Sequence, residues 1–292
     1  MADPVPASVL GAPRRAPRWA RRSPLATAIA VLVCMVFVLP VLWLLVGSLR
    51  PADEIFSSLS PLSWRILVPS QVTFENFAGL LLGPFGRALV VSLLVCLISV
   101  AVGTVLCALA AYAVAVLRFP GRGIVFAVIV VGFMIPFEAI AIPLSQLFTG
   151  WGLTNTIIGL VLPGIGNGLA VFNLRQHFLS IPASYREAAM IDGASEPRIF
   201  GSIYWPLGGG ALVNSALLIF LGQWGSFLWP LLVVSDRSLQ VAPVALSQAF
   251  GEHTSNFGQH FAGAVILSLI PAVLMFIMQR SFGGLSIASG EK

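Results

Sequence analysis

Six apolar runs constrain this chain more than any other feature of its sequence. They cover residues 25–49, 88–117, 123–148, 157–178, 208–234 and 261–278. A helix needs about 20 apolar residues to cross the hydrocarbon core of a bilayer, so each run is long enough to span a membrane. With 58% hydrophobic and 9% charged residues, the chain lacks the composition of an ordinary soluble domain. The sequence therefore predicts an all-α polytopic membrane protein with six transmembrane helices.

The positions of the basic residues predict how the chain is oriented. Residues 1–24 contain five arginines and are expected to form a cytosolic tail, because the apolar run that follows is too long for a signal peptide. Residues 25–279 would then form the transmembrane domain, and residues 280–292 a cytosolic C-terminal tail. With the N-terminus inside, all but four of the 16 basic residues lie on the inner side; the exceptions are Arg50, Arg65, Arg87 and Arg237. Both termini and the loop over 180–207 are expected in the cytosol.

Several kinds of chemistry are excluded by the residues themselves. Lys292 is the only lysine, so the chain has no phosphate-binding loop of the G-x-x-x-x-G-K-[ST] type and cannot bind ATP in that way. Cys34, Cys96 and Cys107 all lie within apolar runs, where cysteine acts as a small hydrophobic residue. The three histidines show no metal-binding spacing, and no nucleophile motif is present. We therefore expect no catalytic site and no cofactor bound by this chain. The net charge of +5 does not indicate nucleic-acid binding, because the arginines lie in the short connections between apolar runs.

The polar loop over 180–207 has the signals of two short helices joined at a glycine bend. Ser184 and Glu187 have the spacing of a capping box, which predicts a helix start, and Gly193 is placed to end that helix. Ser195 offers a second start and Pro206 a second stop. A small-residue face beside Glu187 would let another protein approach closely, which predicts a docking element. The alternative is an amphipathic helix lying on the membrane surface.

This loop resembles a known element. The residues that carry the resemblance are Glu187-Ala188-Ala189, Ile191-Asp192-Gly193-Ala194, Phe200, Ile203 and Pro206-Leu207. They are similar to the EAA loop of ABC-transporter permease subunits, which is the coupling helix that inserts into a cleft on the cytosolic ATPase subunit. The resemblance implies that Glu187 contacts the ATPase and that Gly193 sets the bend. The residues it assigns to coupling are Arg186, Glu187, Ala188, Ala189, Asp192, Gly193 and Ala194.

Further short motifs extend the resemblance over nearly the whole chain. They include Leu49-Arg50-Pro51, Thr73 to Phe77, Ala111-Tyr112-Ala113, Gly152 to Thr156 and Trp224 to Pro230. Together they are similar to the MalG-type permeases of carbohydrate ABC importers. The chain departs from that family at Gly225, where asparagine is usual, and in its last four residues. These departures affect substrate and tail details and leave the loop intact.

The resemblance also implies an assembly. The chain would be one half of a heterodimeric pore in a bacterial cytoplasmic membrane, paired with a second permease subunit. Two copies of a cytosolic ABC ATPase would bind ATP and magnesium, and an extracytoplasmic solute-binding protein would deliver the sugar. No nucleic acid is expected among the partners of this assembly.

A few polar side chains within the apolar runs are candidates for the substrate path. Glu138 lies mid-span between two prolines, and it would either bond a sugar hydroxyl or a gate partner, or pair with a neighbouring helix. The glycine-rich stretch 164–168 interrupts the fourth run, either to line a cavity or to let helices pack closely. A final set combines aromatic faces with hydrogen-bonding groups, as sugar sites do, although tryptophan is also common at membrane interfaces. That set is Gln223, Trp224, Ser226 and Trp229.

Two other functions stay open at this point. A permease for glycerol phosphate or another polar solute would resemble a sugar permease closely. A proton-coupled secondary transporter could use Glu138 as its proton site, but it would be expected to carry more ionisable groups in its spans and often an internal repeat, and neither is visible.

Overall fold

The computed structural model describes residues 24–51, 54–55, 71–252 and 256–282, and these are folded as helices, turns and short connections without any strand. Most of the predicted N-terminal tail and nearly all of the C-terminal tail lie outside the described residues. The helices in chain order, leaving aside the loop after α7, are α1 (Pro24–Ser48), α2 (Glu75–Leu82), α3 (Pro84–Ala115), α4 (Arg122–Met134), α5 (Phe137–Gly150), α6 (Ile157–Ile165), α7 (Gly168–Ser180), α11 (Gly209–Trp224), α12 (Leu228–Val233), α13 (Ala242–Glu252) and α14 (Phe257–Phe282).

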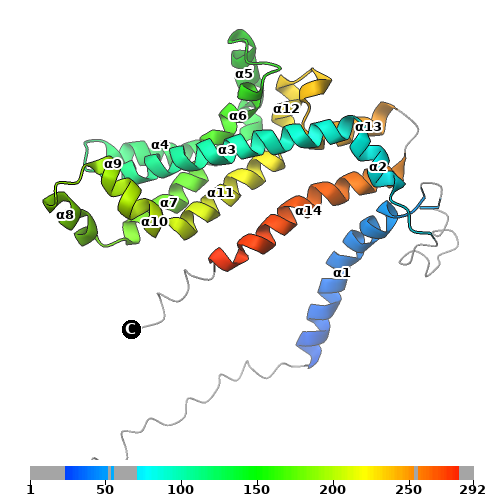
Figure 1. Cartoon of the computed structure of the whole chain (residues 1–292), viewed down its shortest axis with the longest axis horizontal. Helices are drawn as coiled ribbons and strands as arrows, with labels where there is room; N and C mark the ends of the chain where they lie inside the picture. The colour runs from blue at the N-terminus through cyan, green and yellow to red at the C-terminus, as the bar shows by residue number, and fades with distance from the viewer. Residues whose placement is uncertain (1–23, 52–53, 56–70, 253–255, 283–292) are drawn as a thin grey trace, which may run out of the picture.

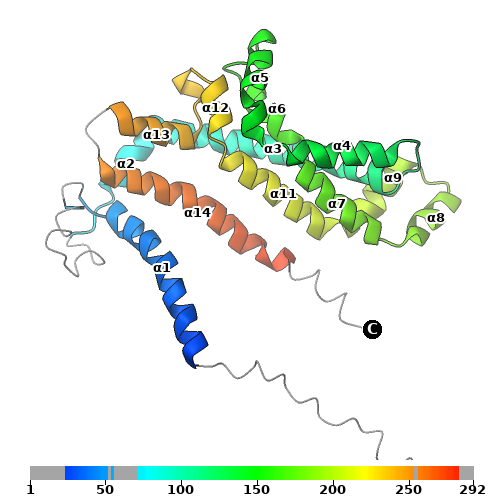
Figure 2. The same ribbon diagram turned by 180° about the vertical axis from the view of Figure 1, so that it is seen from behind.

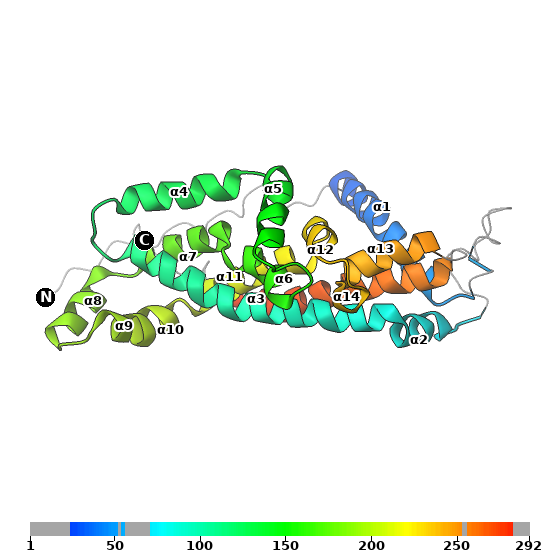
Figure 3. The same cartoon turned by 90° about the horizontal axis from the view of Figure 1, so that it is seen from above.

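Helix α3 runs along the bundle, and α6, α7, α11 and α13 pack against it (Figures 1 and 3). Its 32 residues correspond to a length of about 48 Å, which exceeds the roughly 30 Å of a hydrocarbon core. Small buried residues let neighbouring helices approach it closely. At Gly103, an added Cβ would lie 3.2 Å from the Cα of Ile165 at the end of α6.

Among the described residues, three single helices are long and apolar enough to cross a membrane: α1, α3 and α14. The structure reaches six such segments only if each of three bent helix pairs is counted as one span. The run predicted as one helix over 123–148 is divided into α4 and α5, which meet at 98°. Pro136 explains the break, because a residue that precedes proline is driven out of the helical region, and Ile135 has φ −72° and ψ 124°.

The two following runs are also interrupted. Helices α6 and α7 meet at 41°, and Asn167 starts the second of them by accepting a hydrogen bond from the Ala170 N–H at 2.9 Å. The run predicted as one helix over 208–234 instead ends at Trp224, and α12 begins at Leu228. Gly164 and Gly168 lie in close contacts: an added Cβ would lie 2.1 Å from Oε1 of Gln223 and 2.7 Å from Cβ of Phe133, respectively. These contacts support the close-packing interpretation of the glycine-rich stretch.

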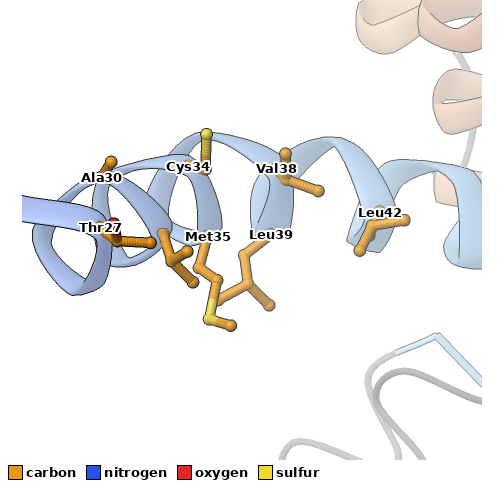
Figure 4. A pocket seen from close by; sticks show the side chains of 8 residues that line it. Thr27, Ala30, Cys34, Met35, Val38, Leu39 and Leu42 are labelled. Atoms are coloured by element: carbon orange, nitrogen blue, oxygen red, sulfur yellow. The ribbon is translucent and has the colours of Figure 1, made fainter. Parts of the chain in front are cut away.

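Helix α1 lies largely apart from the other helices (Figure 2). Only its C-terminal end packs on α14, where the rings of Trp43 and Phe261 are 5.0 Å apart and Gly47 faces the same phenylalanine. Most of α1 is exposed and apolar. A shallow hollow of about 510 Å³ on this helix is lined entirely by its own side chains, including Cys34 and Met35 (Figure 4). This apolar surface suits contact with lipid rather than a polar ligand.

Two asparagines fasten connections between helices through hydrogen bonds to backbone groups. Asn76 on α2 is buried and donates to the carbonyls of Ser48 and Arg50 at 2.9 and 2.6 Å, which fixes the end of α1. Asn155, at φ +55°, accepts hydrogen bonds from the backbone N–H groups of Ser235 and Asp236 at 2.8 and 2.9 Å. Both asparagines belong to motifs noted in the sequence, and each joins segments that are distant along the chain.

Candidate functional site: the polar loop between α7 and α11

The predicted loop projects beyond one end of the bundle, past the C-terminal end of α3 (Figures 1 and 3). Its first helix, α8, runs from Ala183 to Ile191, and Pro182 is its N-cap residue. The predicted capping box is therefore not formed: Ser184 lies inside the helix, and no side chain caps its start. The reason is local, since Pro182, with φ −56° and ψ 132°, is already the last extended residue, two residues before the serine that was expected to cap the helix.

The glycine bend is present where the sequence predicts it. Gly193 has φ +76°, a left-handed conformation that only glycine adopts at little cost. The N–H of Gly193 donates to the carbonyl of Met190 at 3.1 Å, and the N–H of Ala194 donates to that of Ala189 at 2.9 Å. An added Cβ at Gly193 would meet no atom within 4 Å, so glycine is needed here for its backbone conformation and not for space.

The second helical stretch of the loop consists of α9 (Glu196–Ile199), a π-helical turn (Phe200–Tyr204) and α10 (Trp205–Leu207). It ends at Leu207, one residue beyond the predicted stop at Pro206. The proline instead explains the π-helical turn. Because Pro206 has no N–H, the regular ladder is interrupted there, and the N–H of Trp205 donates to the carbonyl of Phe200 five residues earlier.

An aromatic cluster fastens this second stretch to the bundle. The Tyr112 ring, near the C-terminal end of α3, lies 5.2 Å from the ring of Phe200 and 4.9 Å from that of Tyr204. Tyr204 in turn packs edge-on against Phe178 of α7 at 5.7 Å. Ile199 is fully buried beside them. The second half of the loop is thus part of the hydrophobic core.

A polar contact fastens the first half. The Arg186 guanidinium on α8 forms an ion pair with the Glu196 carboxylate at the start of α9. The Tyr112 hydroxyl donates to Oε2 of the same carboxylate at 2.5 Å. The hydrogen bond from Arg186 lowers the pKa of Glu196 below its usual value, and the same bond raises the pKa of Arg186. We call these three residues the loop anchor, because one carboxylate joins α8, α9 and α3.

The remaining predicted coupling residues lie on the surface of the loop. Glu187, Ala188, Asp192 and Gly193 are exposed, whereas Ala189, Ala194 and Arg186 are half-buried on the side that faces the bundle. Large apolar side chains are exposed among them: Tyr185, Met190 and Ile191, the last with 86% of its surface accessible. An apolar surface at this position, beyond the ends of the long apolar helices, is typical of a protein–protein contact.

The structure does not gather the predicted substrate-path residues at one place. Glu138 is exposed in the first turn of α5, where the helix dipole favours a carboxylate, and no ion pair or hydrogen bond to it occurs among the described residues. Gln223 and Trp229 bond to α6, Trp224 bonds to α14, and Ser226 lies half-buried in the break between α11 and α12. Within the described part of the chain, no cluster of three potential metal ligands is present.

Sequence reasoning missed two residues of the loop anchor. Tyr112 belongs to one of the short motifs of the sequence, and Glu196 was not a candidate at all. Neither residue has a local signal for their contact, because 84 positions separate them along the chain. The capping spacing concerns Ser184 and Glu187, which are exposed on α8 and take no part in the loop anchor.

The features that define this class of protein are a bundle of apolar helices and a polar loop that is fastened to one end of the bundle and projects beyond it. Residues 103–284 match the family described as the binding-protein-dependent transport system inner membrane component, and this chain belongs to that family. The matched residues include the whole of the loop and the C-terminal part of α3 on which it is anchored.

The similarity to individual proteins covers most of the chain. It is 34% identical over 263 residues to the arabinooligosaccharides transport system permease protein AraQ of Halalkalibacterium halodurans, covering 87% of this chain and 91% of that protein. It is 34% identical over 274 residues to the trehalose transport system permease protein SugB of Mycobacterium tuberculosis, covering 91% and 94% of the two chains. The fold is also that of a chain in the crystal structure of a bacterial ABC transporter involved in the import of the acidic polysaccharide alginate. That chain has a TM-score of 0.75 at 21% identity, with 91% of this chain and 99% of the other covered.

Proposed function

We propose that this chain is a permease subunit of an ABC importer that moves a sugar across the bacterial cytoplasmic membrane by alternating access. The observation that carries the proposal is α8 itself, an exposed helix with apolar and acidic side chains that is fastened to the end of α3. Membership of a binding-protein-dependent transport family supports it. The two permeases of similar sequence are named for arabinooligosaccharides and trehalose, which supports a mono-, di- or oligosaccharide as the solute.

Helix α8 and the turn at Gly193 would dock into a cleft on a separate ATPase subunit. Glu187 and Asp192 supply exposed carboxylates for polar contacts, and Ile191 supplies an apolar side chain that becomes buried on docking. Movement of the ATPase would then be passed to α3 through the loop anchor, because its carboxylate is bonded both to α8 and to α3. ATP and magnesium would bind to that partner, and this chain would transmit its movement from α8 to α3.

A second permease subunit, two copies of the ATPase and an extracytoplasmic binding protein complete the proposed assembly. No residue of α4 is fully buried within this chain, although every residue of the helix after Arg122 is apolar or glycine. This supports a contact between α4 and the partner permease or lipid. The excess of arginine at the end of the bundle that carries α8 supports a cytosolic location for the loop and for both termini.

For the substrate path we propose Glu138 and Ser226. Both lie at breaks between helices, at the start of α5 and between α11 and α12, where backbone groups are open to a polar partner. Glu138 has no partner among the described residues, so its carboxylate is available to a sugar hydroxyl or to the second permease. Gln223, Trp224 and Trp229 are engaged in contacts with other helices and would shape the path rather than bind the solute.

The test is co-purification of the tagged chain from membranes of its own host, wild type beside Glu187→Ala and Gly193→Pro. Proline cannot reach the φ of +76° found at Gly193, so it should destroy the turn, whereas Glu187→Ala removes one exposed carboxylate. We expect both variants to retain the second permease and to lose the ATPase. Glu75→Ala, an exposed glutamate at the other end of the bundle, is the matched control and should retain both.

Two results would contradict the proposal. One is a wild-type chain that purifies alone and transports a solute down a proton gradient. The other is full recovery of the ATPase with both loop variants. The sugar itself would be identified by screening solutes for stimulation of ATP hydrolysis in the reconstituted complex.

A further inference from the structure

Four of the described helices contain an internal proline (Pro40, Pro143, Pro163 and Pro271), and at the last two the structure supplies a replacement for the missing backbone donor. In an α-helix the N–H of residue i donates to the carbonyl of residue i−4, and proline has no N–H. Pro163 of α6 therefore frees the carbonyl of Gly159, and Pro271 of α14 frees that of Leu267. The hydrocarbon core of a membrane offers no water to such a carbonyl, so a donor from elsewhere in the protein stabilises it.

In both cases that donor is a tryptophan. Nε1 of Trp229 donates to the carbonyl of Gly159, and Nε1 of Trp224 donates to the carbonyl of Leu267, each at 2.9 Å. The two tryptophan side chains are 3% and 5% exposed, so both donors are buried. Each indole thus meets the carbonyl that a proline has freed, although 70 and 43 positions separate donor and acceptor along the chain.

The two tryptophans lie on either side of the break between α11 and α12. Trp224 is the last residue of α11, and Trp229 is the second residue of α12. Gln223 adds a third bond, from its Nε2 to the carbonyl of Leu160 at 3.2 Å. The glycine at 164 makes this approach possible, because a Cβ there would overlap the Gln223 amide. One short segment, residues 223–229, is therefore bonded to two proline-containing helices.

We propose that Trp224 and Trp229 are positioning residues that replace the donors missing at Pro271 and Pro163, and that segment 223–229 thereby sets the angles of α14 and α6 relative to α11. A proline permits a helix to bend, but it does not select one angle. The indole bond selects the angle, since it is made only where the freed carbonyl meets the donor. These bonds depend only on the geometry of this chain and do not require any particular solute.

The test is a set of crossed double substitutions. Trp229→Phe and Trp224→Phe keep an aromatic ring and remove the donor, whereas Pro163→Ala and Pro271→Ala restore the backbone N–H. We expect each Trp→Phe change to lower the thermal midpoint of the purified protein by roughly 2–8 °C. Pro163→Ala should restore the midpoint of Trp229→Phe but not of Trp224→Phe, and Pro271→Ala should do the reverse. Trp151→Phe, an exposed tryptophan, is the control and should leave the midpoint unchanged.

A second measurement reports how firmly α6 and α14 are held relative to each other. Spin labels on Ile158 of α6 and Phe276 of α14, both exposed, give the distance between the two helices; Cys34, also exposed, is first replaced by alanine. We expect Trp224→Phe to broaden the distance distribution and the matched addition of Pro271→Ala to narrow it again. A contribution to stability alone would leave the distribution unchanged.

Three results would overturn the proposal: double substitutions whose effects simply add, equal rescue by the mismatched proline change, or a distance distribution that does not respond. If a Trp→Phe variant yields no folded protein, recovery of a monodisperse species by the matched Pro→Ala change alone supports the proposal. Recovery by neither proline change, or by both equally, refutes it.

Discussion

Replacing Glu196 by glutamine should loosen α8 from the bundle without removing either helix of the loop. Glutamine keeps the shape of the side chain and can still accept a hydrogen bond from Tyr112, but it loses the charge that pairs with Arg186. The two charged side chains are 21% and 35% exposed, so solvent partly screens the pair. Exposed pairs contribute about 0.2–1 kcal/mol and hydrogen bonds to charged groups about 1.5–3 kcal/mol. We therefore expect the free energy that holds α8 on the bundle to fall by about 1–2 kcal/mol. This corresponds to a roughly 5- to 30-fold rise in the fraction of molecules in which α8 is detached.

Hydrogen exchange measured by mass spectrometry gives that population. Peptides covering residues 183–194 should exchange roughly 5- to 30-fold faster in Glu196→Gln than in the wild type, because their amides exchange from the detached state. Peptides from the middle of α3 should be unaffected. Glu187→Gln is the matched control, since this exposed glutamate of α8 makes no bond to the bundle among the described residues and should not change the exchange. In the assembled transporter, the same loosening should raise ATP hydrolysis per solute moved.

The reasoning would be refuted if exchange in α8 were the same in Glu196→Gln and the wild type. It would also be refuted if the charge reversal Arg186→Glu with Glu196→Arg did no better than either single change, because an ion pair should be restored by exchanging its partners.

Two further predictions concern pH and the substrate path. The pKa of Glu196 is lowered by its hydrogen bond from Arg186, so the anchor's contribution to stability should be complete above the usual carboxyl value of 4.5 and should be lost as the pH falls through the lower, folded-state value. The difference in thermal midpoint between wild type and Glu196→Gln should therefore shrink on acidification; Asp236, whose pKa is also lowered, is present in both proteins and cancels. Glu138→Gln should lower solute uptake without reducing recovery of the second permease or the ATPase, and unchanged uptake would remove Glu138 from the path.

The elements that the sequence predicts best are those with local causes. Gly193 ends α8 in the left-handed conformation because the residue type alone permits it. The run over 25–49 and the helix α1 differ by only one residue at each end, since an apolar run of that length bounded by polar residues has few alternatives. The capping spacing predicts the helix start in the loop two residues late, because Pro182 and not Ser184 sets the boundary.

The errors arise where tertiary contacts decide the outcome. Prolines and glycines at 136, 163–168 and 225 mark places where a helix is weakened, but the sequence does not state whether it bends by 41° or by 98°. Trp224 and Trp229 were considered as sugar-binding candidates from their residue type. Their hydrogen bonds to carbonyls freed by prolines assign them a packing role that depends on two distant helices.

By itself, then, the sequence determined the membrane class, the approximate limits of the apolar segments, the placement of arginine in the connections between them and the glycine turn of the loop. Each of these follows from residues that are adjacent along the chain, through hydrophobicity, charge or backbone freedom. Only the tertiary structure decided the bends, the tryptophan–carbonyl bonds and the anchor that joins Tyr112, Arg186 and Glu196. These contacts connect groups many residues apart, and their stability comes from burial and hydrogen bonding in a bundle that no local pattern specifies.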